Sequence, residues 1–206
     1  MRTIVNYCVI LSALLIVSGP VQAASYYVDS VSGNDANNGT SQSTAWKTLT
    51  KVNGKTFAAG DKILFKAGGS WTGQLNPKGS GASDNPINPI IIDMYGTGAK
   101  PIINGNGVTG NGAVYFTNQE YWEVNNLEIT NDAATEGDRR GVYILASSSG
   151  TWDHIYLKNL YIHNIAGVID STEAAKRTGG INIRGTHTSA RFNDILSENC
   201  VSSSCY

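Results

Sequence analysis

Two stretches of the chain decide the fold: Trp122-Glu-Val-Asn-Asn126-Leu-Glu-Ile-Thr-Asn131 and Ile155-Tyr-Leu-Lys-Asn159-Leu-Tyr-Ile-His-Asn164. They match position by position, and each carries apolar residues on both sides of a central asparagine. The two central asparagines are 33 residues apart. A strand-containing unit of this length cannot close a core alone, so the repetition predicts units that stack on one another.

A third copy begins at Ile195 and carries its central asparagine at Asn199. A shorter apolar stretch precedes each copy, at Gly112–Phe116, Gly141–Ile144 and Gly180–Ile183. Each unit should therefore contain a short strand, a turn, a longer strand bent at the asparagine, and a loop of variable length. Stacking such units in parallel register predicts an all-β fold, a right-handed parallel β-helix or solenoid.

The central asparagines of the three copies should align along this stack. Asparagine tolerates left-handed backbone better than most residues, and its amide bonds readily to neighbouring backbone. We therefore expect a structural asparagine ladder at the bend, formed by Asn126, Asn159 and Asn199, in preference to a catalytic row.

Short β runs separated by Gly, Asn and Pro continue through the rest of the chain. Besides the repeats, we expect strands at Ser25–Val28, Lys62–Lys66, Ile90–Met94 and Ile102–Ile103.

A single segment has helical period, because four apolar residues fall on one helical face: Ala45, Trp46, Leu49 and Val52. Ser43 or Thr44 could cap this helix, which should end at Asn53-Gly54. We expect it to cover the open edge of the first coil, which would otherwise invite aggregation.

The first 23 residues have the features of a secretory signal peptide. Arg2 is their one charge, Val9–Val17 is almost wholly apolar, and Val21-Gln22-Ala23 supplies the small residues of a cleavage site. The sequence predicts secretion, with no membrane segment after cleavage. Residues 24–60 should then form the N-terminal strand, loop and capping helix, and residues 61–206 the β-helix coils. Because the third copy stops at Tyr206, we expect an incomplete last coil.

Composition excludes some partners. The chain has 15 basic and 16 acidic residues, which gives a net charge of −1. Nucleic-acid binders usually carry a clear basic excess, so no nucleic-acid partner is expected. Export would allow Cys200 and Cys205 to pair, although their spacing does not decide whether they do.

Several stretches resemble the N-terminal cap and first coils of secreted right-handed β-helix proteins of the pectate lyase superfamily, and above all polysaccharide lyase family 9. The matching stretches are Tyr26–Val28, Gly33–Thr40, Ala45–Leu49, Gly60–Gly68 and Pro89–Gly96. The resemblance implies a lyase that cleaves an acidic polysaccharide such as pectate by β-elimination. The family's catalytic residues lie on later coils, so none transfers to a position in this chain.

Elimination next to a uronate carboxylate needs a base within reach of the proton, and Ca²⁺ or arginine to neutralise the carboxylate. Two loops combine basic and acidic residues in this way, and they precede the short strands of successive repeats. The candidate substrate-binding residues are Arg139, Arg140, Lys176, Arg177 and Arg184, with Trp152 as a surface on which a sugar could stack. The candidate calcium ligands are Asp132, Glu136, Asp138, Asp170 and Glu173.

The same residues leave structural alternatives open. Charged loop residues often form surface ion pairs of little energetic consequence. The stretch Asp35–Gly39 offers oxygens at alternating positions, but it lacks the acidic residue that closes an EF-hand loop, so turn formation is favoured.

Three functions remain open at the level of sequence. The first is a polysaccharide lyase, and the second is a glycoside hydrolase on the same scaffold, which needs a pair of carboxylates across the groove. The third is a non-catalytic carbohydrate-binding or surface protein, because one fold can host many chemistries.

Overall fold

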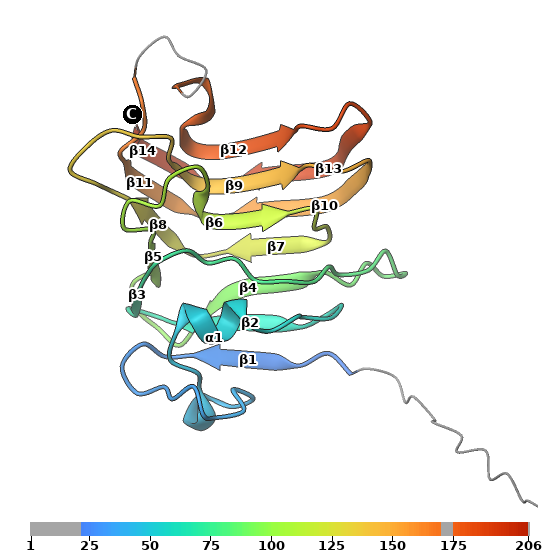
Figure 1. Cartoon of the computed structure of the whole chain (residues 1–206). Helices are drawn as coiled ribbons and strands as arrows, with labels where there is room; N and C mark the ends of the chain where they lie inside the picture. Colours follow the sequence, from blue (N-terminus) through green and yellow to red (C-terminus); the bar gives the residue numbers. More distant parts are fainter. Residues whose placement is uncertain (1–21, 170–174, 206) are drawn as a thin grey trace, which may run out of the picture.

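The computed structural model describes residues 22–169 and 175–205 of the chain. These residues form an all-β protein whose strands lie in three parallel sheets (Figure 1). Helical structure in these two ranges is limited to α1 (Leu49–Asn53) and the 3-10 turns Gln42–Thr44 and Ala175–Arg177. The prediction of an all-β fold with almost no helix is confirmed.

Each sheet collects equivalent strands from successive parts of the chain. The six-stranded sheet has the order β1 (Ser25–Val28), β2 (Lys62–Lys66), β4 (Ile90–Tyr95), β7 (Trp122–Asn125), β10 (Gly150–Lys158) and β13 (Ala190–Glu198). The five-stranded sheet contains β3 (Ser70–Thr72), β5 (Ile102–Asn104), β8 (Glu128–Asn131), β11 (Tyr161–Ile165) and β14 (Val201–Cys205). The three-stranded sheet contains β6 (Gly112–Thr117), β9 (Arg140–Ala146) and β12 (Gly179–Gly185).

From β4 onward the chain visits the six-, five- and three-stranded sheets in turn, and then begins again. The register of the strands follows the sequence repeat, because Ile155 of β10 pairs with Trp122 of β7 and with Ile195 of β13. Likewise, Val142 of β9 pairs with Ile181 of β12. The predicted alignment of the three sequence copies is therefore confirmed.

The central asparagines lie at the bend between the six-stranded and five-stranded sheets. Asn126, Asn159 and Asn199 have positive φ angles of 57°, 55° and 51°, which is the left-handed backbone expected of them. The side-chain amide of Asn159 donates to Oδ1 of Asn126 at 2.5 Å, and the side-chain amide of Asn126 donates to the Asp93 carboxylate at 2.7 Å. The ladder thus extends to Asp93, one repeat earlier than the sequence copies indicated.

The core is a continuous apolar column between the sheets. Trp122, Val124, Leu157 and Ile162 are fully buried, as are the inward residues of the neighbouring strands. The indole of Trp122 packs against Phe116 at 4.9 Å between ring centroids, which confirms that Trp122 is a core residue.

The N-terminal end differs from the prediction in one respect. The expected helix from Ser43 or Thr44 is wrong for its first half, since α1 begins at Leu49 after the N-cap Thr48. Trp46 instead has extended backbone: its N–H donates to the Tyr27 carbonyl, and its carbonyl accepts from Asp29 N–H, both at 2.8 Å. Hydrogen bonding to β1 therefore overrides the helical period, and this extended segment covers the free edge of β1.

Other predictions fall at the ends of the chain. The predicted signal peptide lies outside the described residues except for its last two positions. Cys200 is a free thiol in the described part of the chain, and the side chain of Cys205, its possible disulfide partner, lies outside that part. None of the helices in the described ranges has the length and apolar character that a bilayer crossing requires.

Candidate functional site at the corner loops

The loop between β8 and β9 leaves one corner of the molecule and projects from the stack (Figure 1). Its base is held by Asn131, which is fully buried and donates from its side-chain amide to the carbonyls of Val108 and Arg140. Ala166, just after β11, donates to the Asn131 carbonyl, and its own carbonyl accepts from Gly137 N–H. The loop is therefore fastened to the following repeat.

Arg139 is the central tie of this corner, and it is 7% exposed. Its guanidinium donates to the carbonyl oxygens of Thr135 at 2.6 Å, Ala166 at 3.0 Å and Gly107 at 3.2 Å. Hydrogen bonds from a charged donor are the stronger kind, and here they join segments from three successive repeats. The side chain is therefore occupied in shaping the loop.

A cavity of about 330 Å³ opens beside this tie. Asp132 and Glu136 line it from the loop, and Asn164, Ala166 and Ser204 line it from the following strands. Two exposed carboxylates thus face one cavity on a scaffold fastened by Arg139. Carboxylates, an amide and a hydroxyl can all hydrogen-bond to the hydroxyl groups of a sugar.

Arg140 turns away from this cavity and is 1% exposed. Its Nη2 lies 2.6 Å from the Asp138 carboxylate, and its guanidinium lies 4.3 Å from the centroid of the Tyr143 ring. Tyr143 in turn stacks on Tyr115 of the preceding repeat at 5.5 Å. The Nε and Nη1 atoms of Arg140 are buried, without a hydrogen-bond partner in the described part of the chain.

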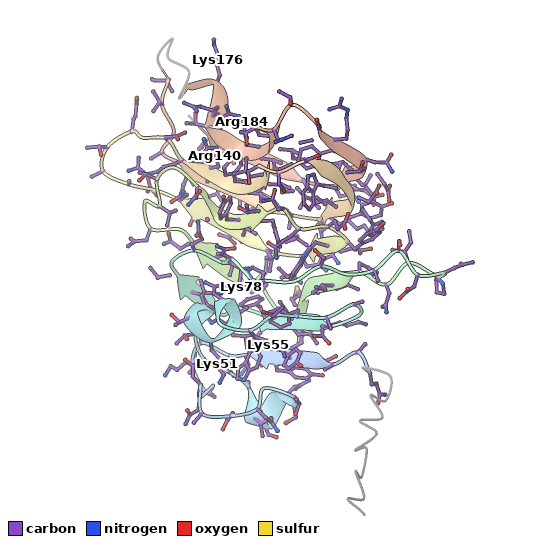
Figure 2. The ribbon with its side chains drawn as sticks, turned by 45° about the vertical axis from the view of Figure 1, so that its right-hand side comes forward. Lys51, Lys55, Lys78, Arg140, Lys176 and Arg184 are labelled. Atoms are coloured by element: carbon purple, nitrogen blue, oxygen red, sulfur yellow. The ribbon has the colours of Figure 1, made fainter. Side chains whose placement is uncertain are left out.

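The remaining candidates for substrate binding lie apart from the cavity. Lys176 and Arg177 belong to the 3-10 turn before β12, and Gly179 pairs with Arg140, so this turn leaves from the predicted corner. Arg184 pairs with Leu145 near the far end of the same strands (Figure 2). Trp152 lies on β10 in the six-stranded sheet, opposite Phe192. A substrate-binding role for these residues stays a prediction.

The candidate calcium ligands are divided among different environments. Asp132 and Glu136 share the cavity, Asp138 pairs with Arg140, and Asp170 and Glu173 lie outside the described residues. Among the residues that are described, no group of three His, Cys, Asp or Glu side chains is arranged to hold a metal ion. Calcium binding therefore stays a prediction from the sequence.

A second cluster of titratable residues lies on the outer face of the six-stranded sheet. His154 of β10 places Nδ1 2.9 Å from Asp194 of β13 and Nε2 3.2 Å from Glu123 of β7. Lys158 donates to Glu123 at 3.0 Å, and the Tyr156 hydroxyl donates to Asp194 at 2.8 Å. Because both ring nitrogens of His154 are engaged, the cluster cross-links three strands and presents no free imidazole nitrogen.

The hydrogen-bond partners in this cluster lower the pKa values of its two carboxyl groups, Glu123 and Asp194. Burial raises the pKa of Glu123, but the hydrogen bonds from Lys158 and His154 outweigh it and leave the pKa below its usual value. Hydrogen bonds from His154 and Tyr156 hold the pKa of Asp194 below its usual value. The same hydrogen bond to Asp194 raises the pKa of the Tyr156 hydroxyl. All these shifts favour charged carboxylates, which suits a structural cross-link.

The sequence interpretation missed two features of these sites. The Tyr115–Tyr143 stack could have been found, because each tyrosine follows the inward valine of its short strand, Val114 or Val142. The His154 cross-link had a partial signal, because His154 and Asp194 directly precede the paired residues Ile155 and Ile195 and so occupy the same position of their repeats. Glu123 aligns with Tyr156 instead and gave no such signal.

No model of a known protein family matches this chain. The chain is similar to glycoside hydrolases. In particular, it is 33% identical to a lacto-N-biosidase of Bifidobacterium longum subsp. longum over 207 aligned positions. The alignment covers 76% of this chain and 13% of that protein.

Solved structures point to the same class. Two crystal structures of the GH136 lacto-N-biosidase from Eubacterium ramulus, native and selenomethionine-substituted, match with TM-scores of 0.74. Their sequence identities to this chain are 29% and 28%, respectively. Each match covers 86% of this chain and 34% of the solved one. The chain thus spans well under half the length of the relatives it matches.

These comparisons correct the expected family. The resemblance to polysaccharide lyase family 9 is wrong, and so are the pectin-lyase fold family and the lyase activity it implied, because the strong matches are glycoside hydrolases. The physical reason is visible at the N-terminal end. Stretches such as Ala45–Leu49 close the edge of a sheet, so they carry information about the scaffold and none about the reacting bond.

Proposed function

We propose that the chain forms coils of a right-handed parallel β-helix in a secreted glycoside hydrolase of the lacto-N-biosidase kind. The observation that carries this proposal is the 33% identity to a lacto-N-biosidase over 76% of the chain. Export is proposed from the apolar segment Val9–Val17 and the cleavage site at Ala23.

The β-helix is supported by the order in which the chain visits its sheets. Strands β7, β8 and β9 occupy three different sheets, and β10, β11 and β12 repeat that order one layer further along. Crossovers between parallel strands of one sheet are right-handed in nearly all proteins. Repeated crossovers of this hand wind the chain into a right-handed solenoid.

The corner cavity is the best candidate for contact with the sugar. Glycoside hydrolysis needs two carboxyl groups on either side of the scissile bond, one of which acts as a general acid. Asp132 and Glu136 are the two carboxylates that line this cavity. Two negative groups would repel an acidic sugar, so we propose a neutral saccharide as the occupant of this cavity.

The test is to incubate the purified chain with p-nitrophenyl lacto-N-bioside and to follow both p-nitrophenol release and binding of free lacto-N-biose by calorimetry. Release of p-nitrophenol would support hydrolysis by these coils. Binding without release would favour the non-catalytic alternative, a carbohydrate-binding part of a longer enzyme. Absence of both release and binding would overturn the proposal.

A further inference from the structure

A second cavity lies at the opposite end of the stack from the corner loops. It has a volume of about 440 Å³ and opens beside α1. Its lining residues are Asp35, Trp46, Thr50, Lys51, Gly54 and Lys55. We refer to it as the lysine groove, because Lys51 and Lys55 supply its two cationic groups.

Aromatic rings hold both lysines in place. Tyr26 and Trp46 stack at 4.9 Å between centroids with an interplanar angle of 16°. The ammonium group of Lys55 lies 4.6 Å from the centroid of the Tyr26 ring, and that of Lys51 lies 5.8 Å from the Trp46 ring. Cation–π contacts of this kind orient the ammonium groups before a ligand arrives, which lowers the entropic cost of binding.

A third lysine comes from a distant part of the sequence. Lys78 forms a parallel bridge with Thr56, and the Lys78 carbonyl accepts from Phe57 N–H at 2.8 Å. This pairing sets Lys78 beside the segment that carries Lys55, and the labelled side chains of Lys51, Lys55 and Lys78 lie on one side of the molecule (Figure 2). Two lysines thus line the groove, and the backbone that carries a third runs beside the segment that follows Lys55.

One acidic residue, Asp35, lines the groove beside these charges. Across the described ranges, Lys51, Lys55 and Lys78 form no ion pair. Asp35, the acidic residue of the lining, is already committed: Lys47 N–H, Thr48 N–H and the Thr48 hydroxyl donate to its carboxylate at 2.8, 3.0 and 2.6 Å. Asp35 also attracts Lys51 electrostatically, so it offsets part of the charge of that lysine. The lining still carries two ammonium groups against one carboxylate and is therefore net positive.

We propose that the lysine groove binds the anionic substituent of a saccharide, either a carboxylate or a sulfate. An ammonium group gives charge-assisted hydrogen bonds to such oxyanions, and these are stronger than bonds between neutral groups. The site is separate from the hydrolysis proposed for the corner cavity and needs only binding, so its success or failure does not depend on turnover. It would let the protein hold a charged unit of a glycan whose neutral unit lies elsewhere.

The test is calorimetric titration of the purified chain with trigalacturonate, with a sulfated disaccharide and with neutral maltotriose. The expected result is binding of at least one anionic saccharide, no binding of maltotriose, and weakening at higher salt because exposed charges are screened. The two anionic ligands distinguish recognition of a carboxylate from recognition of a sulfate.

The substitutions K51M and K55M keep much of the apolar stem over the aromatic rings while removing the charge. Each should weaken binding about tenfold or more, the usual consequence of losing one charged hydrogen bond. K62M is the matched control, because Lys62 is an exposed lysine on β2. Equal binding of anionic and neutral saccharides, no binding at all, or unchanged affinity in the double variant K51M/K55M would overturn the proposal. Amide chemical shifts of Lys51 and Lys55 in the unsubstituted chain provide a second readout that requires no variant.

Discussion

Arg139 and Arg140 are neighbours in the sequence, but their guanidinium groups bind different parts of the corner between β8 and β9. Arg139 donates to the carbonyls of Thr135, Ala166 and Gly107, whereas Arg140 pairs with Asp138 and lies over the Tyr143 ring. The alternation of a strand at its first residue explains the division, since successive side chains point to opposite faces. Arg139 therefore stabilises the loop that lines the corner cavity, and Arg140 packs against the Tyr143 side chain of the three-stranded sheet.

The tie made by Arg139 should be important for stability. Replacing it in R139M removes three partly buried hydrogen bonds from a charged donor. We therefore expect a loss of about 2–4 kcal/mol in the free energy of unfolding. Urea unfolding measures this loss. R191M is the control, because the exposed Arg191 donates to carbonyls close to it in sequence. A loss no larger than that of R191M would contradict the tie.

We expect the two carboxylates of the corner cavity, Asp132 and Glu136, to affect the binding or hydrolysis of the saccharide and to leave the stability of the fold unchanged. D132N and E136Q keep the shape of each side chain and remove its charge, and both side chains are exposed. If the cavity contacts the saccharide, each substitution should lower lacto-N-bioside hydrolysis or lacto-N-biose affinity at least about tenfold, with an unchanged melting temperature. E198Q, on exposed β13, should behave like the unsubstituted chain. Equal activity and affinity in all three variants would exclude the cavity as the site.

Substitutions at Asn159 can separate two contributions to stability, the left-handed backbone conformation and the side-chain hydrogen bond to Asn126. N159A should cost about 1–3 kcal/mol, because alanine is strained at a φ of 55° and cannot donate to Asn126. N159G should cost less, since glycine adopts this backbone freely but still lacks the amide. Thermal unfolding of the two variants gives both contributions. If N159G were the more destabilised of the two, the ladder would owe little to backbone conformation.

Stability should fall in acid. Burial raises the pKa of Asp29, but hydrogen bonds from Lys66 and from the Ser32 and Val31 N–H groups outweigh it, and the net pKa is lowered. Asp35 behaves in the same way through Thr48 and Lys47. A carboxyl whose folded pKa lies below its unfolded value contributes stability above the unfolded pKa, and this contribution is lost as pH falls through the folded pKa.

We therefore expect a melting temperature that declines as pH drops below about 4, the ordinary range of an aspartate. D29N should reduce this decline, because it removes one of the groups that must be protonated. D84N is the control on an exposed loop residue and should keep the full decline. The same acid dependence in D29N and the unsubstituted chain would show that Asp29 does not contribute.

Gly33 is required by close approach of the backbone. A Cβ atom there would lie 2.1 Å from the Trp46 carbonyl oxygen and 2.4 Å from that of Asp29, in the segment that covers the edge of β1. G33A should therefore destabilise the chain by about 2–4 kcal/mol or perturb the Trp46 pairing. G54A is the control, because its Cβ would lie 3.3 Å from the nearest atom, the Thr50 carbonyl oxygen. Comparable stability of G33A and G54A would argue against the close approach.

The sequence was sufficient to predict the parallel strands and their register. The match between the repeats around Asn126 and Asn159 reports a local pattern of apolar and turn residues, and stacking turns that pattern into strand pairing. It was not sufficient at Trp46, whose helical spacing is overridden by hydrogen bonds to β1. The motifs at the N-terminal end were equally unable to distinguish lyases from glycoside hydrolases as relatives, because these motifs close the edge of a sheet.

The chain by itself determined which residues repeat, where the backbone bends and that the three copies align, because these depend on neighbours within one unit. The tertiary structure alone decided that Arg139 is buried as a tie, that Asp132 and Glu136 share a cavity, and that Lys78 lies beside Lys55. These facts depend on loops of unequal length from different repeats. The contacts between such loops are set by packing across layers, which has no period in the sequence.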